Sequence, residues 1–214
     1  MSNPLRNSIA LKSTVAGALL GTLLLAPSAR ASEWELDAAH STAAFAVRHL
    51  MVSTVKGEFE KVSGTVHLDD ADPTKSTIEV TIDATTVSTR NAQRDGHLKS
   101  PDFFDVAKHP NLTFKSTKIE KAGKDKFNVV GDLTIRGTTH PVTLQVTGPT
   151  APIKDMMGRT VRGVAATGKL NRKDWGLVWN KAIEGGGVLV SDEVQLEINA
   201  ELLEKAATAK PASK

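Results

Sequence analysis

The sequence predicts an all-β fold built from antiparallel strands. Apolar and polar residues alternate along most of the 214-residue chain, and turn signals such as Gly123-Lys124-Asp125 and Arg136-Gly137 separate the alternating stretches. Alternation gives each strand one wet face and one buried face, which is the pattern of antiparallel sheets. No helical pattern separates successive strands, so a parallel sheet with βαβ crossovers is disfavoured. One sheet closed into a barrel and two sheets packed as a sandwich both fit about eight such strands.

The strand candidates follow one another along the chain. In EVQLEINAEL (193–202) every second residue is apolar, and in STIEVTID (76–83) the side chains of Ile78, Val80 and Ile82 share one face. Glycine recurs within the strands, which indicates either the curvature of a barrel or room for a cavity. The candidates are 41–49, 55–68, 76–83, 111–119, 126–136, 141–148, 160–170 and 193–202.

A short helical insertion near residues 89–105 interrupts the strands. Thr89 can cap a short helix over 90–98, which Gly96 weakens by about 1 kcal/mol relative to alanine. Ser100-Pro101 can start a further turn, with Asp102 and Asp105 as its caps and the intervening Phe103-Phe104 pair packed on the barrel.

The two ends of the chain differ from its middle. Residues 1–31 combine a basic start, the apolar run Val15 to Ala26 and an A-x-A site, so we expect a signal peptide cleaved before Ser32. The apolar run is too short for the ~20 residues of a membrane span. Residues 204–214 carry no large apolar side chain and are expected to form a flexible tail. Residues 32–203 then form one domain.

Charge and cysteine content restrict the partners and the compartment. Residues 1–31 hold three of the 27 Lys and Arg residues and none of the 24 Asp and Glu residues, so the chain after cleavage is formally neutral, with 24 of each. No basic stripe is left for nucleic acid, and no later segment is apolar enough for stable insertion into a membrane. The lack of cysteine suits an oxidising compartment, here the periplasm of a Gram-negative cell.

No local motif indicates catalysis or metal binding. The six histidines form no H-x-H, H-x-x-x-H or H-x-x-E-H pair, and there is no G-x-S-x-G nucleophile motif. The sequence therefore predicts no catalytic residue, no metal site and no cofactor.

Five phrases in series resemble the YceI-like family of periplasmic lipid-binding proteins. They are DAAHSTAAFAVRHL (37–50), VKGEFEKVSGTVHLD (55–69), RDGHLKSPDFFDVAKHPNLTFKST (94–117), GDLTIRGTTHPVTL (131–144) and LNRKDWGLVW (170–179). The resemblance covers roughly residues 33–203. It implies a single antiparallel lipocalin-like β-barrel that holds a long isoprenoid chain, such as a polyprenyl pyrophosphate or the tail of a quinone, and it implies no common catalytic activity.

The predicted lining of the barrel consists of apolar residues on the inward strand faces and of nearby aromatic residues, each of which could also be plain core. Trp175 and Trp179, four residues apart, suit either the mouth of the barrel or a plug that closes it. The lining residues are Phe45, Val47, Phe59, Ile78, Val80, Ile82, Phe103, Phe104, Phe114, Leu133, Trp175 and Trp179.

Four polar residues are candidates for contact with the head group of a ligand. Arg94 and His97 are three residues apart and share a helix face, and the donor fork of arginine suits phosphate oxygens. Asp95 could hold either of them, or Arg94 and Asp95 could only tie the segment to neighbouring strands. His49 ends an apolar face, as a buried imidazole or a contact at the cavity rim.

The sequence therefore predicts an exported lipid-binding protein that transports, stores or sequesters an isoprenoid lipid, as a monomer or a homodimer. Two alternatives stay open. One is an enzyme acting on a polyprenyl or other amphiphilic substrate, and the other is a structural or stress protein with a filled barrel.

Overall fold

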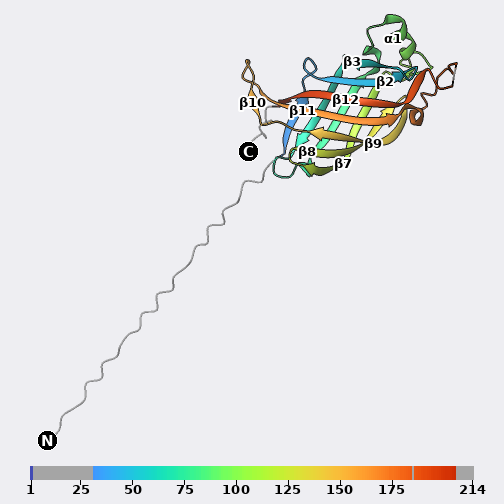
Figure 1. The fold of residues 1–214 in the computed structure, drawn as a ribbon. Helices are drawn as coiled ribbons and strands as arrows, with labels where there is room; N and C mark the ends of the chain where they lie inside the picture. Colours follow the sequence, from blue (N-terminus) through green and yellow to red (C-terminus); the bar gives the residue numbers. More distant parts are fainter. Residues whose placement is uncertain (2–30, 185, 206–214) are drawn as a thin grey trace.

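The computed structural model describes residue 1, residues 31–184 and residues 186–205, which form a barrel of antiparallel strands (Figure 1). The strands are β1 (Ser32–Leu36), β2 (Thr42–His49), β3 (Ser53–Phe59), β4 (Val62–Leu68), β5 (Thr77–Asp83), β6 (Val87–Ser88), β7 (Asn111–Gly123), β8 (Lys126–Ile135), β9 (Thr138–Thr147), β10 (Ile153–Lys154), β11 (Thr160–Asn171) and β12 (Val190–Glu204). The helical elements are the 3-10 turns η1 (Pro73–Lys75), η2 (Ala84–Thr86) and η3 (Arg172–Trp175) and the α-helix α1 (Ala92–Lys99).

The strands close into one ring because β11 pairs with β12. β1 and β2 both pair antiparallel with β12, so together they act as one long strand interrupted at 37–41. β4 pairs with β1 and β3 pairs with β2, so β3 and β4 share the next position in the ring. β5 pairs with β4 and β6 pairs with β3, so β5 and β6 share the position after that. The barrel thus has eight long strand positions in chain order, which confirms the predicted fold class and excludes the sandwich.

The predicted strands are all found, although the candidate 55–68 is divided into β3 and β4. Three short strands lie outside the predicted set: β1, β6 and β10. β1 is five residues long and buries Trp34 and Leu36, and the strand candidates began only at residue 41. Its pairing with β4 and with the end of β12 closes the barrel at the end opposite α1.

Two interior glycines allow aromatic rings to lie against the strands. A Cβ atom on Gly131 would stand 2.4 Å from the Phe114 ring, and one on Gly57 would stand 2.5 Å from the Phe45 ring. Such distances are far shorter than van der Waals contact, so these positions accept only glycine while the rings keep their places.

The helical insertion exists, but its details differ from the prediction. The N-cap of α1 is Asn91 rather than Thr89, because the Asn91 side chain accepts from Arg94 N at 3.0 Å while Thr89 bonds to Asp95. Residues 101–104 form turns rather than a helix, and the Asp102 carboxylate contacts His97 instead of capping.

The predicted signal peptide and most of the predicted tail lie outside the described residues. Within residues 31–184 and 186–205, no helix has the length and apolar character needed to cross a bilayer.

Candidate ligand-binding cavity

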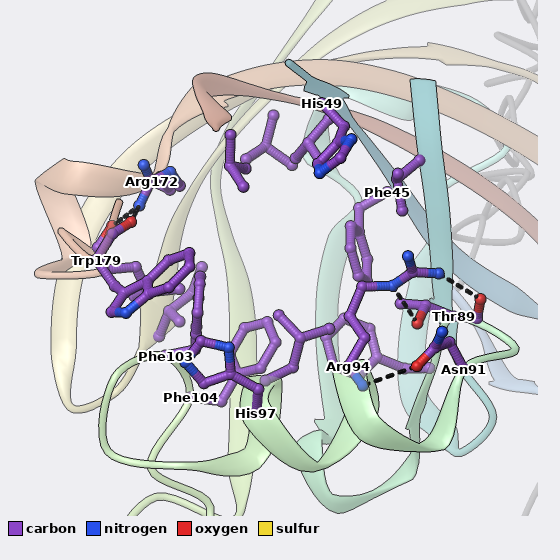
Figure 2. Close-up of a pocket in the computed structure, with 18 of the residues that line it drawn as sticks. Phe45, His49, Thr89, Asn91, Arg94, His97, Phe103, Phe104, Arg172 and Trp179 are labelled. Carbon is purple, nitrogen blue, oxygen red and sulfur yellow. Dashed lines mark hydrogen bonds between the residues drawn. The ribbon is translucent and has the colours of Figure 1, made fainter. Parts of the chain in front are cut away.

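A cavity of about 650 Å³ occupies the end of the barrel that α1 covers (Figure 2). Its walls come mainly from β2, β3 and β12, from the insertion after β6, and from the segment between β11 and β12, with single residues from β7, β8 and β11. The lining residues are Phe45, Val47, His49, Val55, Phe59, Thr89, Asn91, Gln93, Arg94, His97, Leu98, Phe103, Phe104, Leu112, Ile135, Leu170, Arg172, Leu177, Trp179, Leu189, Val190, Val194 and Leu196.

The register of β2 and β12 produces the apolar wall. Val47 lies opposite Val194 and Phe45 opposite Leu196, so the two strands direct these four side chains to the same face. The same alternation turns Gln195 outward. The alternation of apolar and polar residues in the sequence is therefore the direct cause of the apolar interior.

Aromatic rings form the part of the wall beneath α1. The His97 ring meets Trp179 edge to face at 4.7 Å and Phe103 at 5.0 Å between centroids. His97 Nε2 also contacts Asp102 Oδ2 at 2.9 Å. The imidazole is thus fixed at the cavity rim by two rings and one carboxylate (Figure 2).

Arg94 and Asp95 are both tied to Thr89, which is 5 % exposed. Arg94 donates from Nε to Thr89 Oγ1 at 2.8 Å and from Nη2 to Thr89 O at 3.0 Å, while Asp95 Oδ1 accepts from Thr89 N and Oγ1 at 2.8 and 2.5 Å. These bonds anchor α1 to the end of β6. Arg94 lines the cavity, whereas Asp95 does not.

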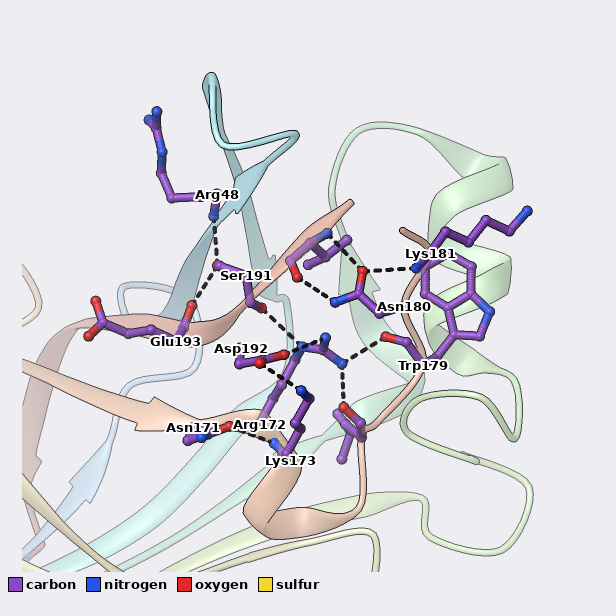
Figure 3. A network of polar contacts seen from close by, with 12 residues as sticks. Arg48, Asn171, Arg172, Lys173, Trp179, Asn180, Lys181, Ser191, Asp192 and Glu193 are labelled. Atoms are coloured by element: carbon purple, nitrogen blue, oxygen red, sulfur yellow. Dashed lines mark hydrogen bonds and ion pairs between the residues drawn. The ribbon is translucent and has the colours of Figure 1, made fainter. Parts of the chain in front are cut away.

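Arg172 is a buried cation that joins the wall segments (Figure 3). It donates to Ser191 O at 3.0 Å, Trp179 O at 2.9 Å and Asp192 Oδ1 at 2.9 Å, and also to Leu177 O. Burial lowers the pKa of the Arg172 guanidinium, and Asp192 partly offsets that shift. Since its donors point at backbone carbonyls, Arg172 fixes the chain that carries Leu177 and Trp179 into the cavity wall.

A second, smaller cavity of about 170 Å³ lies further inside the barrel. Its walls are apolar and include Ile78, Val80 and Phe114, together with Ile198 of β12. Leu196 and Ile198 lie two residues apart on one strand face, so the two cavities follow each other along the interior.

The structure divides the predicted site residues into three groups. Phe45, Val47, His49, Phe59, Arg94, His97, Phe103, Phe104 and Trp179 line the larger cavity, and Ile78, Val80 and Phe114 line the smaller one. Ile82, Leu133, Trp175 and Asp95 line neither. A role in ligand binding stays a prediction for all of these residues, and the structure places the third group away from both cavities.

Trp175 and Leu133 show that an inward position in the barrel is not sufficient for a side chain to line a cavity. Trp175 is 2 % exposed and its Nε1 donates to Leu133 O at 2.9 Å, so the indole is packed core beneath the wall. Ile82 pairs across to Val62 and Leu112 and packs against the core cluster. Trp179, four residues after Trp175, is the tryptophan that reaches the cavity.

Several lining residues on β12 and on the segment before it are absent from the predicted lining. Val194 and Leu196 stood in the clearest alternating stretch and could have been included from that signal alone. Arg172 and Leu177 had no such signal, because their inward placement depends on η3 and the irregular segment after it.

Among the described residues, one cluster of side chains has the types that can bind a metal ion. It consists of Asp37, His40 and Glu201, whose potential ligand atoms lie within 4.8 Å of one another. His40 Nδ1 contacts Asp37 Oδ2 at 3.1 Å, and Arg159 Nη2 lies 3.9 Å from the same oxygen. The bond to His40 lowers the pKa of Asp37 and raises that of His40. The group therefore already pairs its charges with protein partners.

The fold and the cavity define the chain as a lipocalin-like β-barrel with an apolar interior site. The chain belongs to the YceI-like family: the model of the YceI-like domain matches residues 34–202. This confirms the family to which the sequence motifs pointed.

Relatives and solved structures agree with that assignment. A UPF0312 protein of Staphylococcus aureus strain MSSA476 is 37 % identical over 170 residues, which cover 79 % of this chain and 96 % of the relative. The structure is similar to Burkholderia cenocepacia BcnA (TM-score 0.66, 25 % identity, 78 % of this chain and 98 % of the other) and to the Campylobacter jejuni YceI protein (TM-score 0.63, 33 % identity, 74 % and 90 %). A polyisoprenoid-binding domain from Saccharophagus degradans shares the fold (TM-score 0.56, 16 % identity, 82 % and 100 %).

Proposed function

We propose that this protein binds a long isoprenoid chain in the apolar interior of its barrel. The observation that carries the proposal is the cavity of about 650 Å³, whose walls are mainly aliphatic and aromatic side chains. Ligand sites in proteins commonly have volumes of roughly 300–1,000 Å³. A neighbour of the same fold is a polyisoprenoid-binding domain, which supports this ligand class.

An apolar chain gains enough free energy in such a cavity without polar contacts. Each buried CH₂ group contributes about 0.8 kcal/mol. A few five-carbon units therefore exceed the association cost of roughly 4–15 kcal/mol. Affinity then depends on apolar surface, and the polar residues at the rim decide which head group fits.

The head group belongs at the rim under α1 in this proposal. Arg94 and His97 border the cavity there, and His49 borders it from β2. Arg94 is held by Thr89 and His97 by Asp102, so both present oriented side chains to a polyprenyl pyrophosphate or a quinone-type head. The role is binding, in the periplasm after signal cleavage, for transport, storage or sequestration.

The test is quenching of Trp179 fluorescence by a prenylquinone, because Trp179 lines the cavity. The double variant Val47→Phe/Val194→Phe fills part of the cavity from two neighbouring positions in its wall. We expect it to raise the Kd at least tenfold, which corresponds to about 1.4 kcal/mol.

The matched control is Ala46→Phe/Gln195→Phe, the neighbouring pair on the same two strands, which faces outward. We expect its Kd to stay within about twofold of the wild type. Equal losses in both variants, or no quenching in a folded wild type, would contradict binding in the barrel. Turnover of a polyprenyl pyrophosphate that disappears in His97→Ala with binding retained would contradict a purely binding role.

A further inference from the structure

The tip of the β2–β3 hairpin exposes three consecutive apolar side chains. Leu50, Met51 and Val52 are 38 %, 51 % and 75 % exposed. Leu50 and Met51 have φ angles of 50° and 59°, a left-handed conformation that tight turns normally fill with Asn or Gly. Neither the turn conformation nor core packing explains bulky apolar residues at this tip, so we infer that their side chains contact a partner outside the protein.

The tip is fixed beside the mouth of the larger cavity. Leu50 N donates to the carbonyl of the lining residue Leu189 at 2.8 Å. The guanidinium of Arg48 donates to Met51 O at 2.9 Å and to Thr54 Oγ1 at 3.0 Å. Val178, 62 % exposed, adds a further apolar side chain between Leu177 and Trp179 of the cavity wall.

Two cations lie close to this apolar tip: Arg48 donates to Met51 O, and the carbonyl of Lys181 accepts from the N–H of Leu189, whose own carbonyl bonds Leu50 N. Residues 48–57 contain Arg48 and Lys56 and no carboxylate. Arg48 and Lys181 have no carboxylate within 4.0 Å in the part of the chain that the structure describes. Figure 3 shows the side chains of Arg48 and Lys181 on opposite sides of the polar network around Arg172, each ending away from that network.

We propose that this mouth docks on an anionic lipid bilayer, with Leu50, Met51, Val52 and Val178 inserted at the interface and the cations against lipid phosphates. Apolar side chains at an interface together with basic residues are the combination that binds anionic membranes. The purpose of docking rests on the proposed function, because a docked mouth lets an isoprenoid chain pass from the bilayer into the cavity without crossing water. The docking itself is peripheral.

The test is sedimentation with vesicles of phosphatidylcholine alone or mixed with phosphatidylglycerol, using protein from expression of the full chain. The variant Met51→Asn/Val52→Ser removes the apolar tip, and asparagine suits the left-handed turn position. We expect the wild type to bind the mixed vesicles, more weakly at high salt, and the variant to bind roughly tenfold more weakly.

The matched control is Met156→Ser/Met157→Ser on the β10–β11 hairpin. Met156 and Met157 are 106 % and 79 % exposed, and this hairpin lies at the far end of the barrel from α1 (Figure 1). We expect the control to bind vesicles like the wild type. All variants share one N-terminus, so any membrane affinity of the apolar run Val15 to Ala26 cancels in the comparison.

Three outcomes overturn the docking proposal: equal losses in tip and control variants, no vesicle binding by the wild type, or no preference for phosphatidylglycerol. The second would assign the tip to a protein partner instead. Equilibrium uptake of a prenylquinone from detergent is measured on the same samples. If no variant takes up the prenylquinone but vesicle binding still depends on the tip, the proposed function is contradicted and the docking proposal is not.

Discussion

Arg172 is the residue whose loss should disturb the cavity wall most. Its guanidinium is 4 % exposed and bonds three backbone carbonyls and Asp192. In Arg172→Met these acceptors lose their donors, and we expect unfolding in urea to show a loss of roughly 2–4 kcal/mol. Arg172→Lys should recover little of it, because an ammonium cannot serve the same fork of acceptors. A loss below 1 kcal/mol would contradict the role of a buried clamp.

His40 should titrate above its ordinary pKa of 6.5, because Asp37 bonds its ring. Glu201 also raises the pKa of His40, and Arg159 opposes the shift. A raised histidine pKa contributes stability below pH 6.5 that is lost as the pH rises through the raised value. The lowered pKa of Asp37 contributes stability above its ordinary 3.8 that is lost as the pH falls through the lowered value.

The measurement is an NMR titration of the His40 ring. The midpoint should lie above 6.5 in the wild type and return toward 6.5 in Asp37→Asn. A midpoint that ignores the substitution would show that Asp37 does not pair with His40 in solution.

At the scale of the elements, the same substitution should have opposite effects at two glycines. Gly131→Ala in β8 places a Cβ 2.4 Å from the Phe114 ring and 2.7 Å from Lys115 O, so we expect a loss of about 1–3 kcal/mol. Gly96→Ala in α1 meets nothing within 4 Å, so helix propensity should stabilise the protein by about 0.5–1 kcal/mol. Chemical denaturation of both variants checks the signs, and equal effects would refute the packing argument.

The strands could be predicted from the sequence because one face of each strand is exposed to solvent, and apolar and polar residues therefore alternate along it. This holds for β5 and β12, whose inward residues could be read directly from STIEVTID and EVQLEINAEL. The short β1 escaped because five residues give too little periodicity. The cap of α1 was misassigned because Thr89 and Asn91 are both good caps, and only the bond from Thr89 to Asp95 decides between them.

At the scale of the whole molecule, the sequence predicted the class and the family but not the division of the interior. Phe45 and Leu133 are both inward and apolar, yet Phe45 borders the cavity whereas Leu133 is buried in the core and accepts a bond from Trp175 at its carbonyl. That difference depends on which side chains arrive from strands far away in the sequence. The hairpin 48–57 likewise shows its cations in sequence, but only the fold brings it to the cavity mouth.

The most direct test of the central claim is native mass spectrometry of protein purified from its own host. We expect a bound amphiphile with an isoprenoid chain, absent from the cavity-filled variant Val47→Phe/Val194→Phe and retained in Ala46→Phe/Gln195→Phe. A folded protein that carries no amphiphile and takes up no added polyprenyl lipid would contradict the claim that the barrel is a lipid-binding site.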